Sequence, residues 1–177
     1  PFETAAAAPL VYLTAWRMLV TRGRLRPGET VLIHAVGAGV GTACLQIAKL
    51  CGARVIATAS TGAKLDKAKA LGADLVVNYS KEDWTRQVRR LAGRGGVDLV
   101  VDYVGKETWA GSLKVLRSGG RLVTCGATTG HDPVEDLRHV FFRQLSILGC
   151  TMGSERDFHE VMRCVFQGSL KPVVDSV

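Results

Sequence analysis

The fold of this chain is decided by residues 31–41, which read Val31-Leu32-Ile33-His34-Ala35-Val36-Gly37-Ala38-Gly39-Val40-Gly41. An apolar strand pattern runs into three alternating glycines, and a helical pattern starts at the last of them. A side chain at Gly37 or Gly39 would keep the backbone away from a pyrophosphate, and one at Gly41 would hold the helix off the strand. The helix N-terminus offers free N–H groups and a positive dipole end to an anion. The stretch therefore predicts the phosphate-binding turn of a dinucleotide-binding fold, if its flanks agree.

Short apolar segments alternate with helical patterns along the rest of the chain. Strands are predicted at residues 30–36, 54–58, 75–78, 97–104, 121–125 and 146–152, and helices at residues 2–21, 40–51, 63–71, 82–91, 107–116 and 156–166. This alternation indicates parallel pairing, right-handed crossovers and helices on both faces of the sheet. We expect one α/β domain over residues 1–177, a doubly wound Rossmann fold with a six-stranded, mainly parallel sheet. Residues 1–28 would form a leading helix and a linker.

Composition and charge indicate which classes of binding partner to expect. The 177 residues are 47% hydrophobic and 22% charged, which is typical of a soluble globular protein, and the net charge is +7. The basic residues are scattered, apart from Arg86, Arg89 and Arg90 on one predicted helix and a second group, Arg22, Arg24 and Arg26, in a loop. No basic stripe is interleaved with aromatic residues, so we expect a small-molecule substrate and no nucleic acid. No apolar run reaches the length of a membrane span, and no signal-peptide pattern is present, so we expect no membrane partner.

The cysteine and histidine patterns bear on metals and on the redox environment. Five cysteines occur in apolar surroundings without a C-x-x-C pair, which favours reduced core thiols and a cytoplasmic location: Cys44, Cys51, Cys125, Cys150 and Cys164. The four histidines do not join them at zinc spacing, so no metal site is predicted. The chain begins with Pro1 rather than Met, and we expect an excised domain or a processed product.

The end of the second predicted strand discriminates between the two nicotinamide dinucleotides. An NAD site usually places a carboxylate there to bind the ribose 2′-hydroxyl. Here Ala59 stands in the expected place, followed by Ser60, Thr61 and then Lys64. Hydroxyls and an ammonium group would bind a 2′-phosphate, so NADP(H) is the predicted cofactor, with Ser60 and Lys64 on the phosphate. The alternative is a helix N-cap at Ser60 or Thr61 beside an ordinary surface lysine.

Motifs spread over nearly the whole chain carry a resemblance to a known family. The chain resembles the cofactor-binding domain of the medium-chain dehydrogenase/reductase superfamily, and within it the quinone oxidoreductase-like and zinc-type alcohol dehydrogenase-like NADPH enzymes. The motifs occur in family order and include Ala6-Ala7-Ala8-Pro9-Leu10, Thr14-Ala15-Trp16, Pro27-Gly28-Glu29-Thr30, the glycine turn, Gln46-Ile47-Ala48-Lys49, Ala70-Leu71-Gly72-Ala73-Asp74, Gly96-Val97-Asp98, Gly119-Gly120-Arg121 and Gly168-Ser169-Leu170-Lys171-Pro172.

The resemblance implies roles for individual residues. Thr14 matches a threonine that faces the nicotinamide end of the cofactor, although a core helix threonine is the plain alternative. The implied remaining contacts are Ala38, Gly39 and Val40 on the pyrophosphate within the turn Gly37 to Gly41, then Ser60, Lys64 and Tyr79 around the adenosine 2′-phosphate, and Val104, Gly105, Gly126 and Ala127 in loops that line the cofactor. For Tyr79 the alternative is an aromatic residue that packs on the loop at a strand end.

The resemblance also implies what lies outside the chain. Leu10 stands near the place where zinc-dependent relatives carry a cysteine ligand, so zinc is expected only in an N-terminal barrel-like domain that this chain lacks. The implied function is hydride transfer from NADPH to a quinone, enone or related carbonyl compound, with no catalytic residue named and the isolated domain inactive alone. Two alternatives stay open: a zinc-containing alcohol dehydrogenase, and a non-catalytic nucleotide-binding or redox-sensing module. A homodimer is expected through the strand edge near Ser146–Met152, with simple core burial as the alternative.

Overall fold

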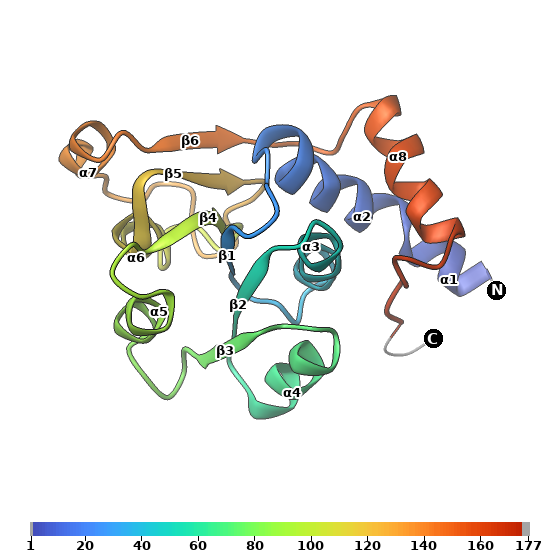
Figure 1. The fold of residues 1–177 in the computed structure, drawn as a ribbon, viewed down its shortest axis with the longest axis horizontal. Coiled ribbons are helices and arrows are strands. Elements are labelled where there is room, and N and C mark those ends of the chain that lie inside the picture. Colours follow the sequence, from blue (N-terminus) through green and yellow to red (C-terminus); the bar gives the residue numbers. More distant parts are fainter. Residues whose placement is uncertain (1, 175–177) are drawn as a thin grey trace.

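A computed structural model describes residues 2–174 and contains a six-stranded sheet. Figure 1 shows the helices arranged around this sheet. The strand order is β3-β2-β1-β4-β5-β6, and every pairing is parallel. The strands are β1 (Thr30–Ile33), β2 (Arg54–Ala59), β3 (Leu75–Asn78), β4 (Val97–Val101), β5 (Leu116–Thr124) and β6 (Ser146–Gly149). The order reverses between β1 and β4, which is the switch point of a doubly wound sheet. The predicted fold class is therefore confirmed.

The helices cover both faces of the sheet and create two cores. Their bounds are α1 (Phe2–Ala7), α2 (Pro9–Trp16), the π-helix η1 (Arg17–Arg22), α3 (Gly39–Leu50), α4 (Gly62–Ala70), α5 (Trp84–Ala92), α6 (Trp109–Val115), α7 (Leu137–Phe142) and α8 (Glu155–Phe166). Val31 and Ile33 of β1 point into a core shared with α2, α3 and α8, whereas Leu32 points into a core shared with α5 and α6. This alternation explains why β1 reads as a continuous apolar run.

The leading segment departs from the prediction of one helix over residues 2–21. Pro9 begins α2, and the helix is interrupted at Ala8 because proline has no N–H to donate to the preceding turn. Beyond Trp16 the helix widens into η1, where the N–H of Gly23 bonds the carbonyl of Met18 at 2.8 Å. Tyr12, Met18 and Leu19 are fully buried along this segment.

Several element ends also differ from the predicted bounds. The strands β1 and β4 are shorter than predicted, because Ala35 turns into the left-handed region (φ 47°) after β1 and the carboxylate of Asp102 accepts from the backbone after β4. The strand β6 ends at Gly149 rather than Met152. β5 is longer, because residues 116–120, predicted as helix end and loop, join it with a register shift against β4. The helix α7 lies where the sequence predicts none. Its N-cap is Asp136, whose side chain accepts from the N–H of Arg138.

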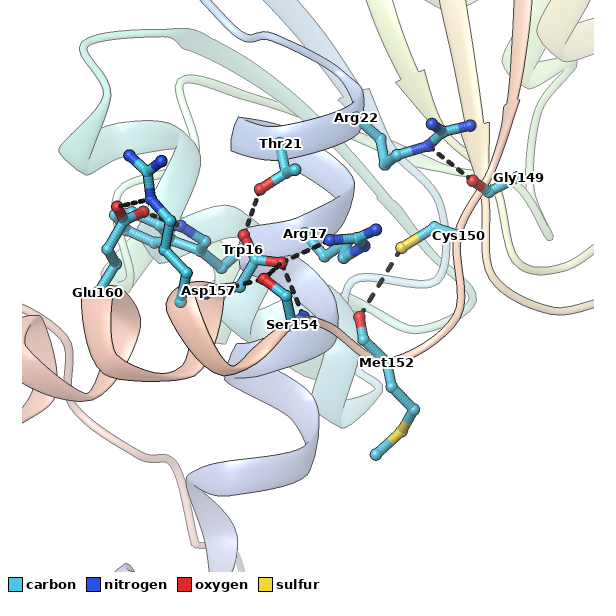
Figure 2. A network of polar contacts seen from close by, with 11 residues as sticks. Trp16, Arg17, Thr21, Arg22, Gly149, Cys150, Met152, Ser154, Asp157 and Glu160 are labelled. Carbon is cyan, nitrogen blue, oxygen red and sulfur yellow. Dashed lines mark hydrogen bonds and ion pairs between the residues drawn. The ribbon is translucent and has the colours of Figure 1, made fainter.

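A polar network ties α8 to the leading helices (Figure 2). The carboxylate of Asp157 accepts from Nη1 of Arg17 at 2.8 Å, from the hydroxyl of Thr21, and from both the N–H and the hydroxyl of the N-cap Ser154. Burial raises the pKa of Asp157, but these hydrogen bonds outweigh it and hold the pKa below the usual range. Asp157 therefore fixes the start of α8 against η1. Across residues 2–174, none of the helices combines the length and the apolar character needed to cross a membrane.

Candidate functional site

The glycine turn connects β1 to α3 at the carboxyl edge of the sheet, and Gly41 is its tightest position. A Cβ on Gly41 would lie 2.8 Å from Cα of Val36, 2.9 Å from the carbonyl oxygen of Ala35 and 2.5 Å from the hydroxyl oxygen of Tyr103. The Tyr103 hydroxyl donates to the same Ala35 carbonyl at 3.0 Å. Burial raises the pKa of Tyr103 well above its ordinary value, so this donor keeps its proton. As the sequence predicts, only glycine lets α3 pack against β1 here.

The predicted 2′-phosphate residues meet in a small hollow beside the turn. A cavity of about 160 Å³ is lined by Gly37 and Ala38 from the turn, Ser60 from the β2–α4 connection, Lys64 from the first turn of α4, and Tyr79 after β3. The aliphatic stem of Lys64 crosses Gly37 so closely that a Cβ there would lie 2.9 Å from its Cδ. Gly37 thus makes room for a lysine stem.

Of the two residues predicted as possible N-caps, Ser60 and Thr61, the cap is Thr61. The hydroxyl of Thr61 accepts from the backbone N–H of Lys64 at 3.4 Å and caps α4. That leaves Ser60 free of the capping role. Within residues 2–174, neither the ammonium of Lys64 nor the hydroxyl of Ser60 has a hydrogen-bond or ion-pair partner. Both groups are therefore free to form hydrogen bonds with a ligand.

A larger cavity of about 450 Å³ adjoins this hollow along the carboxyl edge. Ala38 and Tyr79 border both spaces, and Val104 adds a predicted residue to the larger one. The other side chains at its wall include His34, Trp84, Tyr103, Thr108, Thr128 and Thr129. The two spaces together form one elongated cleft over the ends of β1, β2 and β4, where ligands bind in open α/β sheets.

Asp102, directly after β4, organises the floor of the larger cavity. Its Oδ1 accepts from the N–H groups of Val104 and Gly105 at 3.0 Å each and from the hydroxyl of Thr108 at 2.9 Å. Its Oδ2 accepts from the hydroxyl of Ser112 at 2.6 Å. The fully buried carboxylate thus has four donors and fixes the loop that carries the predicted residues Val104 and Gly105.

His34 joins the same network from the end of β1. Its Nε2 lies 3.0 Å from Oγ of Ser112, and its Nδ1 lies 3.3 Å from Oγ1 of Thr58. Because Ser112 gives its proton to Asp102, it must accept from His34, which assigns the Nε2–H tautomer and makes Thr58 the donor to Nδ1. Burial lowers the pKa of His34, and the charge of Asp102 only partly opposes this, so the imidazole is neutral near pH 7.

The loop after β5 closes against the loop after β4. Gly105 (φ 92°) approaches it so closely that a Cβ would lie 2.6 Å from the carbonyl oxygen of Gly130 and 2.9 Å from Cα of Ala127. The hydroxyl of Thr129 donates to the Val104 carbonyl at 2.8 Å. The predicted residues Gly105 and Ala127 are therefore in contact. A Cβ on the predicted residue Gly126 would lie 3.6 Å from the carbonyl oxygen of Tyr103, which is an ordinary van der Waals contact.

Seven predicted residues line neither cavity: Gly41, Gly105, Gly126 and Ala127, described above, and Thr14, Gly39 and Val40. The Thr14 hydroxyl donates to the carbonyl of Leu10 at 2.8 Å within α2, and the side chain is buried, which fits the core alternative. Gly39 faces α2, where its Cβ would lie 3.0 Å from Cγ1 of Val11. Val40 packs half-buried against the main core. The cofactor roles of these residues stay predictions.

His34, Asp102 and Ser112 were not predicted as site residues. Asp102 is a carboxylate at the carboxyl end of a buried strand, which is the one signal that could have pointed to it. No local sequence pattern connects Asp102 to Ser112 or His34, because the network joins residues that lie far apart in the chain.

The part of the chain that the structure describes does not fit a metal centre. Residues 2–174 contain no group of three or more histidine, cysteine, aspartate or glutamate side chains that could hold an ion. Cys44 is buried, and the other four cysteines are half-buried. Burial, with the neighbouring Cys150 second, raises the pKa of Cys125 to about 11, and burial also raises the pKa of Cys44 and Cys150. Thiolates at these positions are scarce at neutral pH, which disfavours redox sensing.

The residues do fit a nicotinamide dinucleotide. The turn leaves no space for a Cβ at Gly41, its N–H groups lie at the start of the twelve-residue α3, and no aspartate or glutamate lines the hollow with Lys64. The hollow thus holds an ammonium group and a hydroxyl beside the turn, with no carboxylate in its lining.

Comparisons with known proteins identify the family of this chain. A family model described as zinc-binding dehydrogenase matches residues 39–167. The 2-haloacrylate reductase of a Burkholderia species is 36% identical over 170 residues, which cover 93% of this chain and 51% of the reductase.

Two solved structures are similar over almost the whole chain. One is named an NAD-dependent alcohol dehydrogenase, with a TM-score of 0.93 and 51% identity over 98% of this chain and 50% of that one. The other is a 2-octenoyl-CoA carboxylase reductase, CinF, in complex with NADP and 2-octenoyl-CoA, with a TM-score of 0.91 and 29% identity over 97% of this chain and 43% of that one. This chain spans about half the length of each of these relatives. Because the family model covers most of the chain and the solved structures share its fold, the chain belongs to the zinc-binding dehydrogenase family, as a cofactor-binding domain of the medium-chain dehydrogenase/reductase superfamily.

Proposed function

We propose that this chain is the cofactor-binding domain of an NADPH-dependent oxidoreductase that reduces a quinone, an enone or a related conjugated carbonyl compound. The observation that carries the proposal is the hollow in which Ser60 and Lys64 stand beside Gly37 without a carboxylate. When bound, NADPH supplies the hydride. Two of the relatives support the substrate class, because 2-haloacrylate and 2-octenoyl-CoA both carry a carbon–carbon double bond conjugated to a carbonyl group.

The chain's residues bind and orient in this proposal. The ammonium of Lys64 and the hydroxyl of Ser60 bind the 2′-phosphate, and the N–H groups of Gly39 and Val40 face the pyrophosphate. The N–H of Ala38 instead donates to the carbonyl of Ala35 at 2.9 Å and holds the turn. The Asp102 carboxylate holds the Val104–Gly105 loop against the nicotinamide half of the cofactor. Preorganisation of this kind positions the reacting carbon at low entropic cost.

The rest of the active site lies outside this domain in our proposal. A further domain supplies the opposite wall of the substrate cleft, and with it any zinc ligands, so the 177-residue domain binds cofactor and turns over little substrate alone. We name no acid or base among the residues of this chain.

A second candidate function is an NAD-dependent alcohol dehydrogenase. The solved structure that carries that description is 51% identical to this chain, which favours it. The two candidates differ in the group that the Ser60–Lys64 hollow receives, so one measurement separates them.

That measurement is the affinity for NADPH and for NADH, followed through the nicotinamide fluorescence at low salt. We expect tighter binding of NADPH. Lys64→Ala should weaken NADPH about tenfold, which corresponds to about 1.4 kcal/mol, and leave NADH nearly unchanged. Lys69→Ala is the matched control, because Lys69 lies on the same helix and pairs with Asp66 at the surface. Equal affinities for both nucleotides in the unmutated protein would contradict the NADPH proposal and favour the second candidate.

A further inference from the structure

A basic hollow lies at the amino-terminal edge of the sheet, opposite the cofactor cleft. It occupies about 510 Å³ between the last turns of α5 and α6, the start of β5 and the helix α7. In Figure 1, α7 stands at the tail of β6, away from the arrowheads that mark the cofactor edge. Six cationic or titratable nitrogen side chains line the hollow and no aspartate or glutamate does: Arg89, Arg94, Lys114, Arg117, His139 and Arg143.

Most of this positive charge has no partner. Arg117 is paired with Asp98, and its Nη2 lies 4.0 Å from Oε1 of Glu29. In the described part of the chain, Arg89, Arg94, Lys114 and Arg143 make no ion pair. Four positive charges are thus left around one space.

Two of the guanidinium groups are held in place by helix-end carbonyls. Arg143 donates from Nη1 to the carbonyl of Leu113 at 2.9 Å and from Nη2 to that of Leu116, and Arg89 donates to the carbonyl of Lys114 at 3.0 Å. Capping of the ends of α6 is the plain structural role of these bonds. It leaves N–H groups on both guanidinium groups unused, since each carries five.

The arrangement also keeps like charges close together. Burial lowers the pKa of Arg143, and the nearby positive charge of Arg89 lowers it further. Arg94 and Lys114 are exposed beside them, and among residues 2–174 their side chains make no hydrogen bond or ion pair. The loop Gly93–Gly96 contributes backbone donors to the hollow, because the N–H groups of Arg94 and Gly95 have no acceptor among residues 2–174. The loop turns at Gly93 and Gly96, which have φ of 80° and 85°. An anion in the hollow would relieve the repulsion and use these donors.

We propose that this hollow binds a phosphorylated small molecule with at least two linked phosphate groups, at a site separate from the cofactor cleft. Two guanidinium groups fixed by carbonyls match phosphate oxygens in the forked geometry of arginine, and Lys114 adds a point charge. Because four positive side chains in the hollow have no ion-pair partner, we expect a ligand that carries two or more negative charges. The concave shape and the lack of aromatic side chains favour a small molecule over a single-stranded nucleic acid, which needs stacking surfaces.

The test is calorimetric titration of the protein with inorganic pyrophosphate, in the presence of saturating NADPH so that the cofactor cleft is filled. We expect one pyrophosphate per chain, with affinity that falls as salt is raised. The double variant Arg94→Ala/Lys114→Ala should bind at least tenfold more weakly. Both side chains are exposed, so the variant should keep its fold and its affinity for NADPH.

The control is Arg90→Ala/Arg163→Ala, which removes the same net charge. Arg90 is exposed on α5 but outside the hollow, and Arg163 is exposed on α8. We expect less than a twofold effect. ADP and adenosine are titrated in parallel: ADP should bind at least as tightly as pyrophosphate, and adenosine should not bind. The proposal is overturned if pyrophosphate fails to bind, if both double variants lose affinity equally, or if a single-stranded oligonucleotide binds tighter than pyrophosphate and depends on the same two residues.

Discussion

At the scale of single residues, the glycine turn depends on close approach of backbone atoms. Gly41 has backbone atoms of Ala35 and Val36 within 3 Å of the place where a Cβ would stand, and backbone cannot move aside as a flexible side chain can. We expect Gly41→Ala to destabilise the protein by about 3 kcal/mol, at the upper end of overpacking effects. Urea denaturation measures this loss.

Gly62 provides the control for Gly41. It begins α4, and a Cβ added to it would meet nothing within 4 Å, so Gly62→Ala should be neutral or slightly stabilising. Equal losses for both variants would show that the loss of glycine flexibility, and not the contact of α3 with β1, is what matters.

His34 is a second residue whose environment makes a measurable prediction. The folded protein keeps the imidazole neutral, whereas the unfolded chain protonates it near its ordinary pKa of 6.5. The unfolded state therefore binds more protons below that pH, and stability falls as the pH drops, by up to about 1.4 kcal/mol per pH unit. His34→Gln should remove this component. Urea unfolding at pH 7.5 and at pH 5.5 tests it, and an unchanged pH slope in the variant would contradict a neutral His34.

At the scale of elements, Asp157 fastens α8 to η1. Because its pKa is lowered in the folded state, its stabilising effect is complete above the unfolded value of 3.8 and is lost as the pH falls through the folded pKa. We expect Asp157→Asn to cost about 2–3 kcal/mol at pH 7. The difference from the unmutated protein should shrink below pH ~4.

The matched control for Asp157 is Asp132. Its ion pair with Lys106, at 3.1 Å, is exposed on both sides, and Asp132→Asn should change stability by less than about 0.5 kcal/mol. Thermal or urea unfolding of both variants decides the matter. A small effect of Asp157→Asn at pH 7 would mean that the apolar packing of α8 holds it in place without the network in Figure 2.

At the scale of the whole molecule, β6 leaves one edge of the sheet open. Its inner neighbour is β5, no strand in the described part of the chain pairs its other side, and Ile147 on it is 40% exposed. An open edge of this kind can pair with a second copy of the chain. We expect a homodimer through this edge, which Ile147→Lys should convert to a monomer without unfolding it. Light scattering after size-exclusion chromatography measures this, and an unmutated protein that is monomeric at high concentration would contradict the expectation.

Local patterns were enough to predict the sheet and the turn. The alternation of strands and helices predicts parallel pairing, and the spacing of Gly37, Gly39 and Gly41 predicts a close passage of backbone. The absence of an acid at Ala59 predicts a hollow suited to a 2′-phosphate. The end of β1 and the break before Pro9 were missed because they depend on the φ of Ala35 and on the missing N–H of Pro9, which compete with the apolar pattern.

What the sequence by itself determined is thus the doubly wound sheet and the place of the cofactor turn in it, since both follow from hydrophobic periodicity and from glycine spacing within about 20 residues. Only the tertiary structure decided that the stem of Lys64 lies across Gly37 and that His34, Ser112 and Asp102 form one chain of hydrogen bonds. It also brought Arg89, Lys114 and Arg143 around one hollow. The physical reason is that such contacts join residues far apart in the chain. They form only when the sheet aligns strand ends and helix ends at its two edges.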